Sequence, residues 1–267
     1  MLEVVLLAGF LGACLGSFLN VCIYRLPLHR SLLQPGSHCA ACGAPIRWYH
    51  NIPIVSWLWL KGRAACCGTR IDARYMWVEA GTAVGVAGLW ALYPSAVAVV
   101  YTLFFCGLIV TALIDLDHFI VPDEFSLGGI PVGLVLSFFV PQLHGTLSSW
   151  EAVMRSGLGI AVGGGGLFLI AIIGTLVLKK EAMGLGDVKL MAAMGAFLGW
   201  QAVVFTVVVA SFIGTAVGIV LLVKRRKVLG VRMPFGPSLA LAAAIWLFFG
   251  GRWWAEHGQA FRLWPSS

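Results

Sequence analysis

Apolar stretches long enough to cross a lipid bilayer recur along almost the whole of this 267-residue chain. Hydrophobic residues make up 60% of the sequence and charged residues only 11%, whereas soluble domains carry about 25% charged residues. Backbone groups in lipid must be satisfied within the protein, and helices do this by themselves. The sequence therefore predicts an all-α polytopic membrane protein.

Windows of apolar residues predict eight transmembrane helices. The first is expected to stay in the protein, because its leading segment carries Glu3 instead of a basic cluster and lacks an obvious small-residue cleavage site. The sixth is short, and its junction with the seventh at Trp200 and Gln201 is the least sharply defined. The predicted spans are 2–24, 76–93, 95–114, 125–141, 157–178, 187–200, 202–223 and 235–250.

Basic residues fall mainly on one side of this predicted topology. With eight spans both termini lie on the same side, where only Arg155, Arg252 and Arg262 accompany them, so the opposite side receives the other 15 of the 18 basic residues. Loops rich in Lys and Arg face the cytoplasm, which predicts that both termini lie outside. The topology also accounts for the net charge of +7 without a nucleic-acid partner.

The predicted loop 25–75 is the only sizeable segment outside the membrane, and it lies on the cytoplasmic side. It is too small to bury a robust core alone, and such small domains usually need a metal or another staple. We therefore expect three parts: a first span over 1–24, a cytoplasmic loop domain over 25–75, and a multi-span membrane domain over 76–267.

Four cysteines gather in this loop domain. Cys39 and Cys42 form a CxxC pair, and Cys66 and Cys67 follow as direct neighbours. Disulfides are disfavoured in the cytoplasm, so the cluster favours a structural zinc site over a disulfide framework. Adjacent cysteines point to opposite faces of an extended segment, so both can bind one ion only in a tight turn, which Gly68 would permit. There are two alternatives to a zinc site. The cysteines are free thiols that remain from a lost metal site, or they have a redox role.

Three further cysteines, Cys14, Cys22 and Cys106, lie within predicted spans and are expected to be packing residues.

Two acidic residues stand at the ends of apolar segments, where a carboxylate is costly and tends to face a protein or water-filled interior. Asp115 ends the apolar run 95–114, and Asp187 closes the sequence Gly184-Leu-Gly186-Asp187. Both lie at the cytoplasmic side of the predicted topology. They are candidates for an acid/base dyad acting on a substrate in the membrane, in which the two carboxyls share one proton.

Other interpretations of the acids remain open. Asp115, Asp117 and Asp123 also suit ordinary solvated acids of an interfacial loop, and Asp187 is also placed to cap the N-terminus of its helix. A multi-span transporter that uses the acid pair as a proton relay is the main functional alternative. A catalytically silent scaffold is a third.

Six motifs occur in order along nearly the whole chain, at 16–27, 51–63, 74–79, 114–123, 184–189 and 234–237. Together they resemble those of the bifunctional type IV prepilin peptidases (leader peptidase/N-methyltransferases). A lone GxGD sequence such as 184–187 is weak evidence, whereas six motifs in order on a matching topology are specific.

The resemblance implies an aspartic protease of the GxGD type, acting at the cytoplasmic face of the bacterial inner membrane. Its substrates would be prepilins and the pseudopilins of type II secretion. It would remove a short basic leader after glycine and then methylate the new N-terminal residue with S-adenosylmethionine. Carried over by motif, Asp115 and Asp187 are the catalytic pair, and Asp117 is the alternative to Asp115.

One departure from the family pattern concerns the metal. The family commonly has two CxxC pairs, and this chain has Ala64 where the second pair would begin. Cys67 matches the second cysteine of that pair and Cys66 is additional, so either Cys66 substitutes as a ligand or the site has three thiolates, which His38 would complete. This departure from the family pattern concerns zinc binding and methyl transfer.

The S-adenosylmethionine site is poorly marked. No glycine-rich nucleotide-binding loop occurs, and the glycines at 163–166 lie within a predicted span, where close helix packing is the favoured interpretation. Glu79 and Arg63 are polar residues near the membrane face of the loop domain, and they are the candidates for contacting cofactor or leader. Glu79 is equally placed to pair with Arg74 or Arg25.

Overall fold

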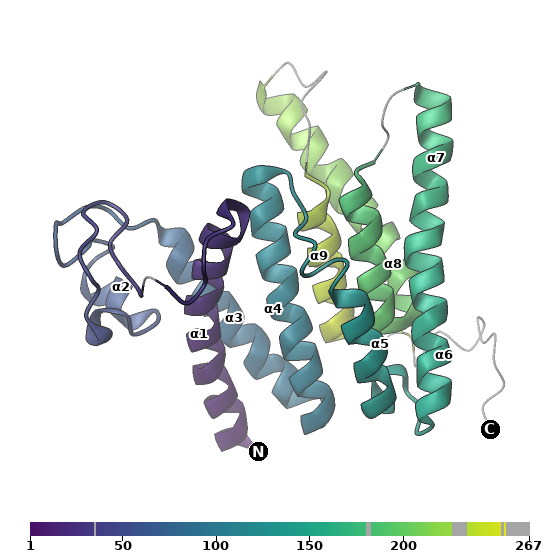
Figure 1. The fold of residues 1–267 in the computed structure, drawn as a ribbon, viewed down its shortest axis with the longest axis horizontal. Coiled ribbons are helices and arrows are strands. Elements are labelled where there is room, and N and C mark those ends of the chain that lie inside the picture. Colours follow the sequence, from purple (N-terminus) through teal and green to yellow (C-terminus); the bar gives the residue numbers. More distant parts are fainter. Residues whose placement is uncertain (35, 180–182, 226–233, 252–253, 255–267) are drawn as a thin grey trace. The chain divides into compact units, whose positions relative to one another are not determined.

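The computed structural model describes residues 1–34, 36–179, 183–225, 234–251 and 254 (Figure 1). In these residues the regular secondary structure is helical, accompanied by two isolated β-bridges. The chain divides into two compact units, residues 1–114 and 115–267. Each unit is described by itself.

The first unit is built on the packing of α1 (Leu2–Arg25) against α3 (Ala73–Leu92). Glycines on α1 allow close contact between the helices, because a Cβ on Gly12 would lie 2.9 Å from the Val86 Cβ and one on Gly16 would lie 2.7 Å from the Glu79 Cα. The side chain of Asn20 donates a hydrogen bond to the carbonyl of Tyr75, at 3.1 Å. The unit also holds most of α4 (Ser95–His118).

Between α1 and α3 the chain forms a loop domain with little regular structure. Its short helical segments are η1 (Leu26–Leu28), η2 (Trp48–His50) and α2 (Val55–Trp59). Two bridges, His38 with Pro45 and Arg63 with Arg70, close two tight hairpins. These hairpins carry the four clustered cysteines.

The second unit begins with the last turn of α4 and contains the remaining helices. α5 (Gly129–Phe139) is followed by η3 (Pro141–His144), and α6 (Ser149–Ile160) continues through η4 (Ala161–Gly165) into α7 (Gly166–Leu178). α8 (Leu185–Arg225) is interrupted at Gly199, whose φ of 80° lies in the left-handed region. The last helix comprises α9 (Gly236–Ile245) and η5 (Trp246–Gly250).

Glycines also bring α6 and α8 together. A Cβ on Gly159 would overlap the carbonyl of Gly195, and a Cβ on Gly195 would overlap that of Gly159. One turn further on, a Cβ on Gly163 would overlap the carbonyl of Met191. This is the packing expected for the run at 163–166, although Gly165 and Gly166 face open space.

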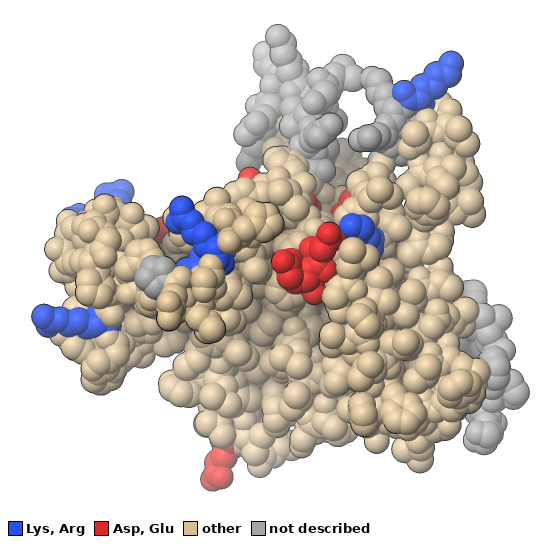
Figure 2. Space-filling view, viewed as in Figure 1, with Lys and Arg blue, Asp and Glu red and all other residues tan. Residues whose placement is uncertain are grey.

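These helices confirm the predicted all-α polytopic membrane fold. In the described part of the chain, four helical stretches are long and apolar enough to cross a membrane, Leu2–Leu28, Ser95–His118, Ser149–Val177 and Leu185–Leu221, and two shorter apolar ones are Gly129–Phe139 and Gly236–Gly250. The outer faces of these stretches carry exposed apolar side chains such as Leu103 and Phe212. Figure 2 shows the matching surface, on which charged side chains are few.

The helix boundaries differ from the expected spans where side chains cap a helix. α6 begins eight residues before the predicted start at 157, because the hydroxyl of Ser148 accepts a hydrogen bond from the Glu151 N–H at 3.4 Å. α3 likewise begins at Ala73, after Asp72, whose carboxylate accepts from the Arg74 N–H. The break between the sixth and seventh predicted spans falls at Gly199.

Six of the basic residues used to predict the orientation lie outside the described residues: Lys180, Arg226, Lys227, Arg232, Arg252 and Arg262.

Candidate active site

Asp115 lies in the last turn of α4 and is 5% exposed. Its Oδ2 accepts a hydrogen bond from the backbone N–H of Gly236 at 2.9 Å, at the first residue of α9. The N-terminus of a helix carries unpaired N–H groups and a partial positive charge, and both favour a carboxylate. The start of α9 therefore binds and orients one oxygen of Asp115.

Only glycine fits at position 236 in this arrangement. A Cβ there would lie 2.6 Å from Oδ2 of Asp115 and 3.1 Å from its carboxyl carbon. The sequence marks this place as the Pro234-Phe235-Gly236-Pro237 motif, but it does not indicate which side chain the motif contacts. Gly236 is thus a site residue that sequence reasoning left without a role.

Asp187 lies in the first turn of α8 and is partly buried. The turn before it is compact, since the Asp187 N–H donates to the Gly184 carbonyl at 3.2 Å and a Cβ on Gly186 would lie 3.0 Å from the Val121 Cβ. Asp187 and Asp115 lie close enough for their carboxylates to interact electrostatically. Two carboxyls in such a relation can share a proton and divide the roles of general base and general acid.

The other acids of the first motif are differently placed. Asp117 is exposed, two residues after Asp115 in the same last turn of α4. The side chain of Asp123 is 63% exposed and pairs with the Lys189 ammonium at 3.0 Å. Asp115 is therefore the buried carboxylate of this motif, whereas Asp117 lies at the surface.

Two matching hairpins hold the four clustered cysteines. In the first, the Cys39 N–H donates to the Ala44 carbonyl and the Gly43 N–H to the Cys39 carbonyl. In the second, the Ala64 N–H donates to the Thr69 carbonyl and the Gly68 N–H to the Ala64 carbonyl. Gly43 and Gly68 have φ values of 72° and 71°, which turn each hairpin back on itself.

This correspondence places Ala64 where the first hairpin has Cys39, and Cys67 where it has Cys42. Cys66 corresponds to Ala41, yet its Sγ lies 3.4 Å from that of Cys42 and 3.8 Å from that of Cys67. The Sγ atoms of Cys39 and Cys67 are 3.7 Å apart, and all four lie within 4.8 Å of one another. Four thiolates at Zn–S distances of about 2.3 Å in a tetrahedron are separated by about 3.8 Å, so this cluster fits a zinc ion.

The thiols of the cluster differ in acidity. Hydrogen bonds from the Thr69 hydroxyl and N–H lower the pKa of Cys67 to about 6. Hydrogen bonding to the Cys42 and Cys39 thiols raises the pKa of Cys66 to about 12. Thiols this close together cannot all ionise without a cation among them, because the thiolates repel one another. A bound metal ion would offset this repulsion.

Glu79 and Arg63 belong to different parts of the first unit. Glu79 is buried in α3, and its Oε2 accepts a hydrogen bond from the Ile54 N–H at 2.6 Å. Ile54 has a φ of 62°, unusual for a β-branched residue, so this contact holds a strained turn of the loop domain onto α3. Arg63 is exposed in the second cysteine hairpin, and no hydrogen bond or ion pair joins it to Glu79 in the described residues.

Two family models match the chain. The model described as "Bacterial Peptidase A24 N-terminal domain" matches residues 10–93, and the model described as "Type IV leader peptidase family" matches residues 102–219. The second match contains Asp115 and Asp187, and the first contains the four clustered cysteines.

Curated relatives match the chain over nearly its full length. A prepilin leader peptidase/N-methyltransferase of Pseudomonas putida is 35% identical, with 95% of this chain and 93% of the relative covered. Proteins of the same name from Stutzerimonas stutzeri and Aeromonas hydrophila are 34% and 36% identical. Those two alignments cover 98% and 90% of this chain and 96% and 90% of the relatives.

No solved structure matches the chain at a significant level. The identities to the curated relatives, their coverage of both chains, and the two matching models agree on one assignment. This membrane protein belongs to the type IV leader peptidase family.

Proposed function

We propose that this protein is a membrane aspartic endopeptidase that removes the basic leader of type IV prepilins and type II secretion pseudopilins after glycine, with Asp115 and Asp187 as its catalytic pair. The observation that carries the proposal is the buried Asp115 carboxylate, bound at one oxygen by the Gly236 N–H and in electrostatic reach of Asp187. Membership of the leader peptidase family supplies the substrate class.

The chemistry needs one ionised and one protonated carboxyl. The ionised carboxylate takes a proton from water while the water oxygen attacks the carbonyl carbon of the scissile peptide bond. The protonated partner then donates its proton to the leaving amine nitrogen as the C–N bond breaks. Each turnover consumes one water and returns the pair to a singly protonated state, and the pair titrates as a unit. The Gly236 N–H donates its hydrogen bond to Oδ2 of Asp115, so Oδ1 is the oxygen that can bind water or substrate.

A second activity, N-methylation of the new N-terminal residue, belongs to the same proposal. S-adenosylmethionine supplies the methyl group when it is bound, and the loop domain 25–75 is the part of the chain associated with this step. Arg63, exposed on the second hairpin, and Glu79, in α3 beneath the strained turn, are the proposed contacts.

Zinc is the metal proposed for the loop domain, held by Cys39, Cys42, Cys66 and Cys67. A structural zinc ion would join the two hairpins of a domain too small to bury a robust core. We further propose that both termini lie outside the inner membrane and that the acids and the loop domain face the cytoplasm.

The test is cleavage of a membrane-embedded prepilin by the purified protein, followed by mass spectrometry of the product. We expect a shorter product that begins at the residue after the leader glycine and carries one added methyl group when S-adenosylmethionine is present. Asp115→Asn and Asp187→Asn should each lower the cleavage rate by at least about 1,000-fold, since each removes one of the two proton-transfer groups.

Asp117→Asn is the matched control, because it makes the same chemical change two residues away at an exposed position. It should keep cleavage within a few-fold of the unsubstituted protein. Loss of cleavage in Asp117→Asn with retention in Asp115→Asn would move the first catalytic role to Asp117. Retention in Asp187→Asn would overturn the dyad.

A further inference from the structure

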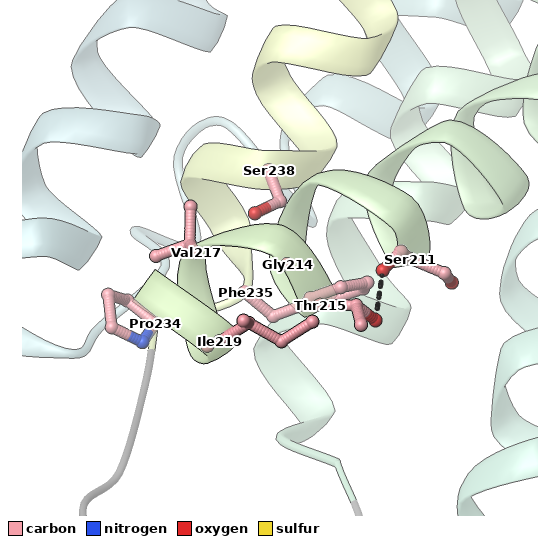
Figure 3. Close-up of a pocket in the computed structure, with 9 residues that line it drawn as sticks. Ser211, Gly214, Thr215, Val217, Ile219, Pro234, Phe235 and Ser238 are labelled. Carbon is pink, nitrogen blue, oxygen red and sulfur yellow. Dashed lines mark hydrogen bonds between the residues drawn. The ribbon is translucent and has the colours of Figure 1, made fainter. Parts of the chain in front are cut away.

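A groove of about 520 Å³ lies between the second half of α8 and the start of α9. On α8 its wall is made of small residues at helical spacing, Ser211, Gly214, Thr215 and Gly218. The hydroxyls of Ser211 and Thr215 donate to the carbonyls of Val207 and Ser211, at 2.7 Å each, so they are already satisfied within their own helix. Figure 3 shows the hydrogen bond between Thr215 and Ser211.

Ser238 is the exception among the hydroxyls that line the groove. It lies on the first turn of α9, is 8% exposed, and has no hydrogen-bond partner in the described part of the chain. Its Oγ is 3.8 Å from the position that a Cβ on Gly214 would take, so the hydroxyl faces the small-residue wall (Figure 3). This unpaired hydroxyl of a largely buried residue is available to bind a polar group that enters the groove.

The lining of the groove includes residues that flank, along the chain, the glycine that binds the Asp115 carboxylate. Phe235 and Ser238 line it, and Gly236, between them, donates the hydrogen bond to Asp115. A chain lying in the groove would therefore contact the turn of α9 whose first residue, Gly236, binds Asp115.

A membrane-embedded substrate has two needs at this place. Its apolar helix must pack against the enzyme, and small residues allow such close helix–helix contact in lipid. Its backbone must also leave the helix where the peptide bond is cut, which exposes N–H and C=O groups that lipid cannot satisfy. The small-residue wall meets the first need, and the unpaired Ser238 hydroxyl meets part of the second.

We propose that this groove binds the apolar membrane segment of the prepilin next to the scissile bond, with Ser238 as a hydrogen-bond partner for its unwound backbone. The assignment rests on the proposed peptidase function. Gly214 sets the depth of the groove, and Ser238 binds the segment close to Asp115.

Photo-crosslinking tests which molecule occupies the groove. A benzophenone amino acid is placed at Val217, which lines the groove, or at Phe212, which is on the same helix, 72% exposed and not part of the lining. Both proteins carry Asp187→Asn so that a bound prepilin is not released by cleavage. We expect at least fivefold more prepilin adduct from position 217 than from position 212. Equal yields, or adducts from position 217 to lipid or to a second copy only, would overturn the assignment.

Kinetics give an independent test with a matched pair of leucine substitutions. Gly214→Leu fills the groove, whereas Ala216→Leu adds bulk to an exposed part of the same helix outside the lining. Gly214→Leu should raise KM for the membrane-embedded prepilin by at least tenfold, and Ala216→Leu by less than twofold. Equal KM values for the two variants would contradict the groove assignment.

Ser238→Ala separates binding from a structural role. It should lower kcat/KM about three- to tenfold and leave the melting temperature unchanged, because the hydroxyl bonds to nothing in the described protein. A lowered melting temperature with unaltered kcat/KM would show a structural role and overturn the assignment of Ser238. If the unsubstituted protein cleaves prepilin but these variants behave like their controls, only the groove assignment fails. Absence of cleavage in the unsubstituted protein would instead contradict the proposed function itself.

Discussion

The backbone N–H of Gly236 donates a hydrogen bond to Oδ2 of Asp115 across 121 positions of sequence. This contact joins the end of α4 to the start of α9, and it leaves no room for a side chain at position 236. It ties the orientation of one proposed catalytic carboxyl to a glycine in a separate motif.

Gly236→Ala is therefore expected to impair peptidase activity. The new methyl group would collide with the Asp115 carboxylate and displace it, and a misplacement of about 1 Å can cost about 100-fold in rate. The measurement is kcat for prepilin cleavage, compared with Gly157→Ala, whose Cβ would meet no atom within 4 Å. Equal kcat values for the two variants would show that this hydrogen bond does not position the reacting group.

Cys66→Ala is expected to lower the zinc content of the purified protein to well below one ion per chain. Cys66 supplies the fourth sulfur of the cluster, in a hairpin where Ala64 takes the place that Cys39 has in the first. Adding Ala64→Cys to Cys66→Ala rebuilds a regular CxxC pair and should restore zinc. Metal analysis by mass spectrometry reads this out without any activity assay.

The two outcomes that would contradict this assignment are distinct. Full zinc content in Cys66→Ala would mean that the remaining three thiolates suffice. Failure of the double variant to regain zinc would mean that the two hairpins are not equivalent as ligand carriers.

Gly195→Ala is expected to destabilise the second unit by about 1–3 kcal/mol or to prevent its folding. The added Cβ would overlap the carbonyl of Gly159, and both helix backbones would have to separate. Gly165→Ala is the matched control, because its Cβ faces open space and alanine favours helix by up to about 1 kcal/mol. Thermal unfolding in detergent compares the two, and equal melting temperatures would contradict the close α6–α8 contact.

His144 is expected to make the protein less stable in mild acid. Burial lowers the pKa of this histidine to about 4, and the nearby Arg155 acts in the same direction. Its ring lies 2.9 Å from the Ser137 hydroxyl. The unfolded chain binds a proton near pH 6.5 and the folded one only near pH 4, so this part of the stability is present above pH 6.5 and is lost as the pH falls toward 4.

The size of this effect is at most about 3 kcal/mol, from 1.36 kcal/mol per unit of pKa. The melting temperature, followed from pH 7 to pH 4.5, should fall more for the unsubstituted protein than for His144→Gln. Parallel curves for the two proteins would show that another group causes the acid sensitivity.

The sequence by itself determined the membrane class and the approximate spans, and it supplied the candidate residues for chemistry. Hydropathy is a local property, and lipid leaves helices as nearly the sole way to satisfy a spanning backbone, so apolar windows predicted the fold class correctly. The acids at span ends and the CxxC pair were recognised for a similar reason, because a carboxylate near hydrocarbon and a thiol cluster are unusual in any context.

The tertiary structure decided relations between distant residues. Hydropathy does not report side-chain capping, so the start of α6 at Ser149 and that of α3 at Ala73 were not predicted. Which acid of the first motif is buried depends on α9, whose Gly236 meets Asp115 and not Asp117. The position of Cys66 depends on two hairpins folding alike, each around a glycine in the left-handed region. These features depend on contacts between residues that are far apart in the sequence, so local sequence patterns do not predict them.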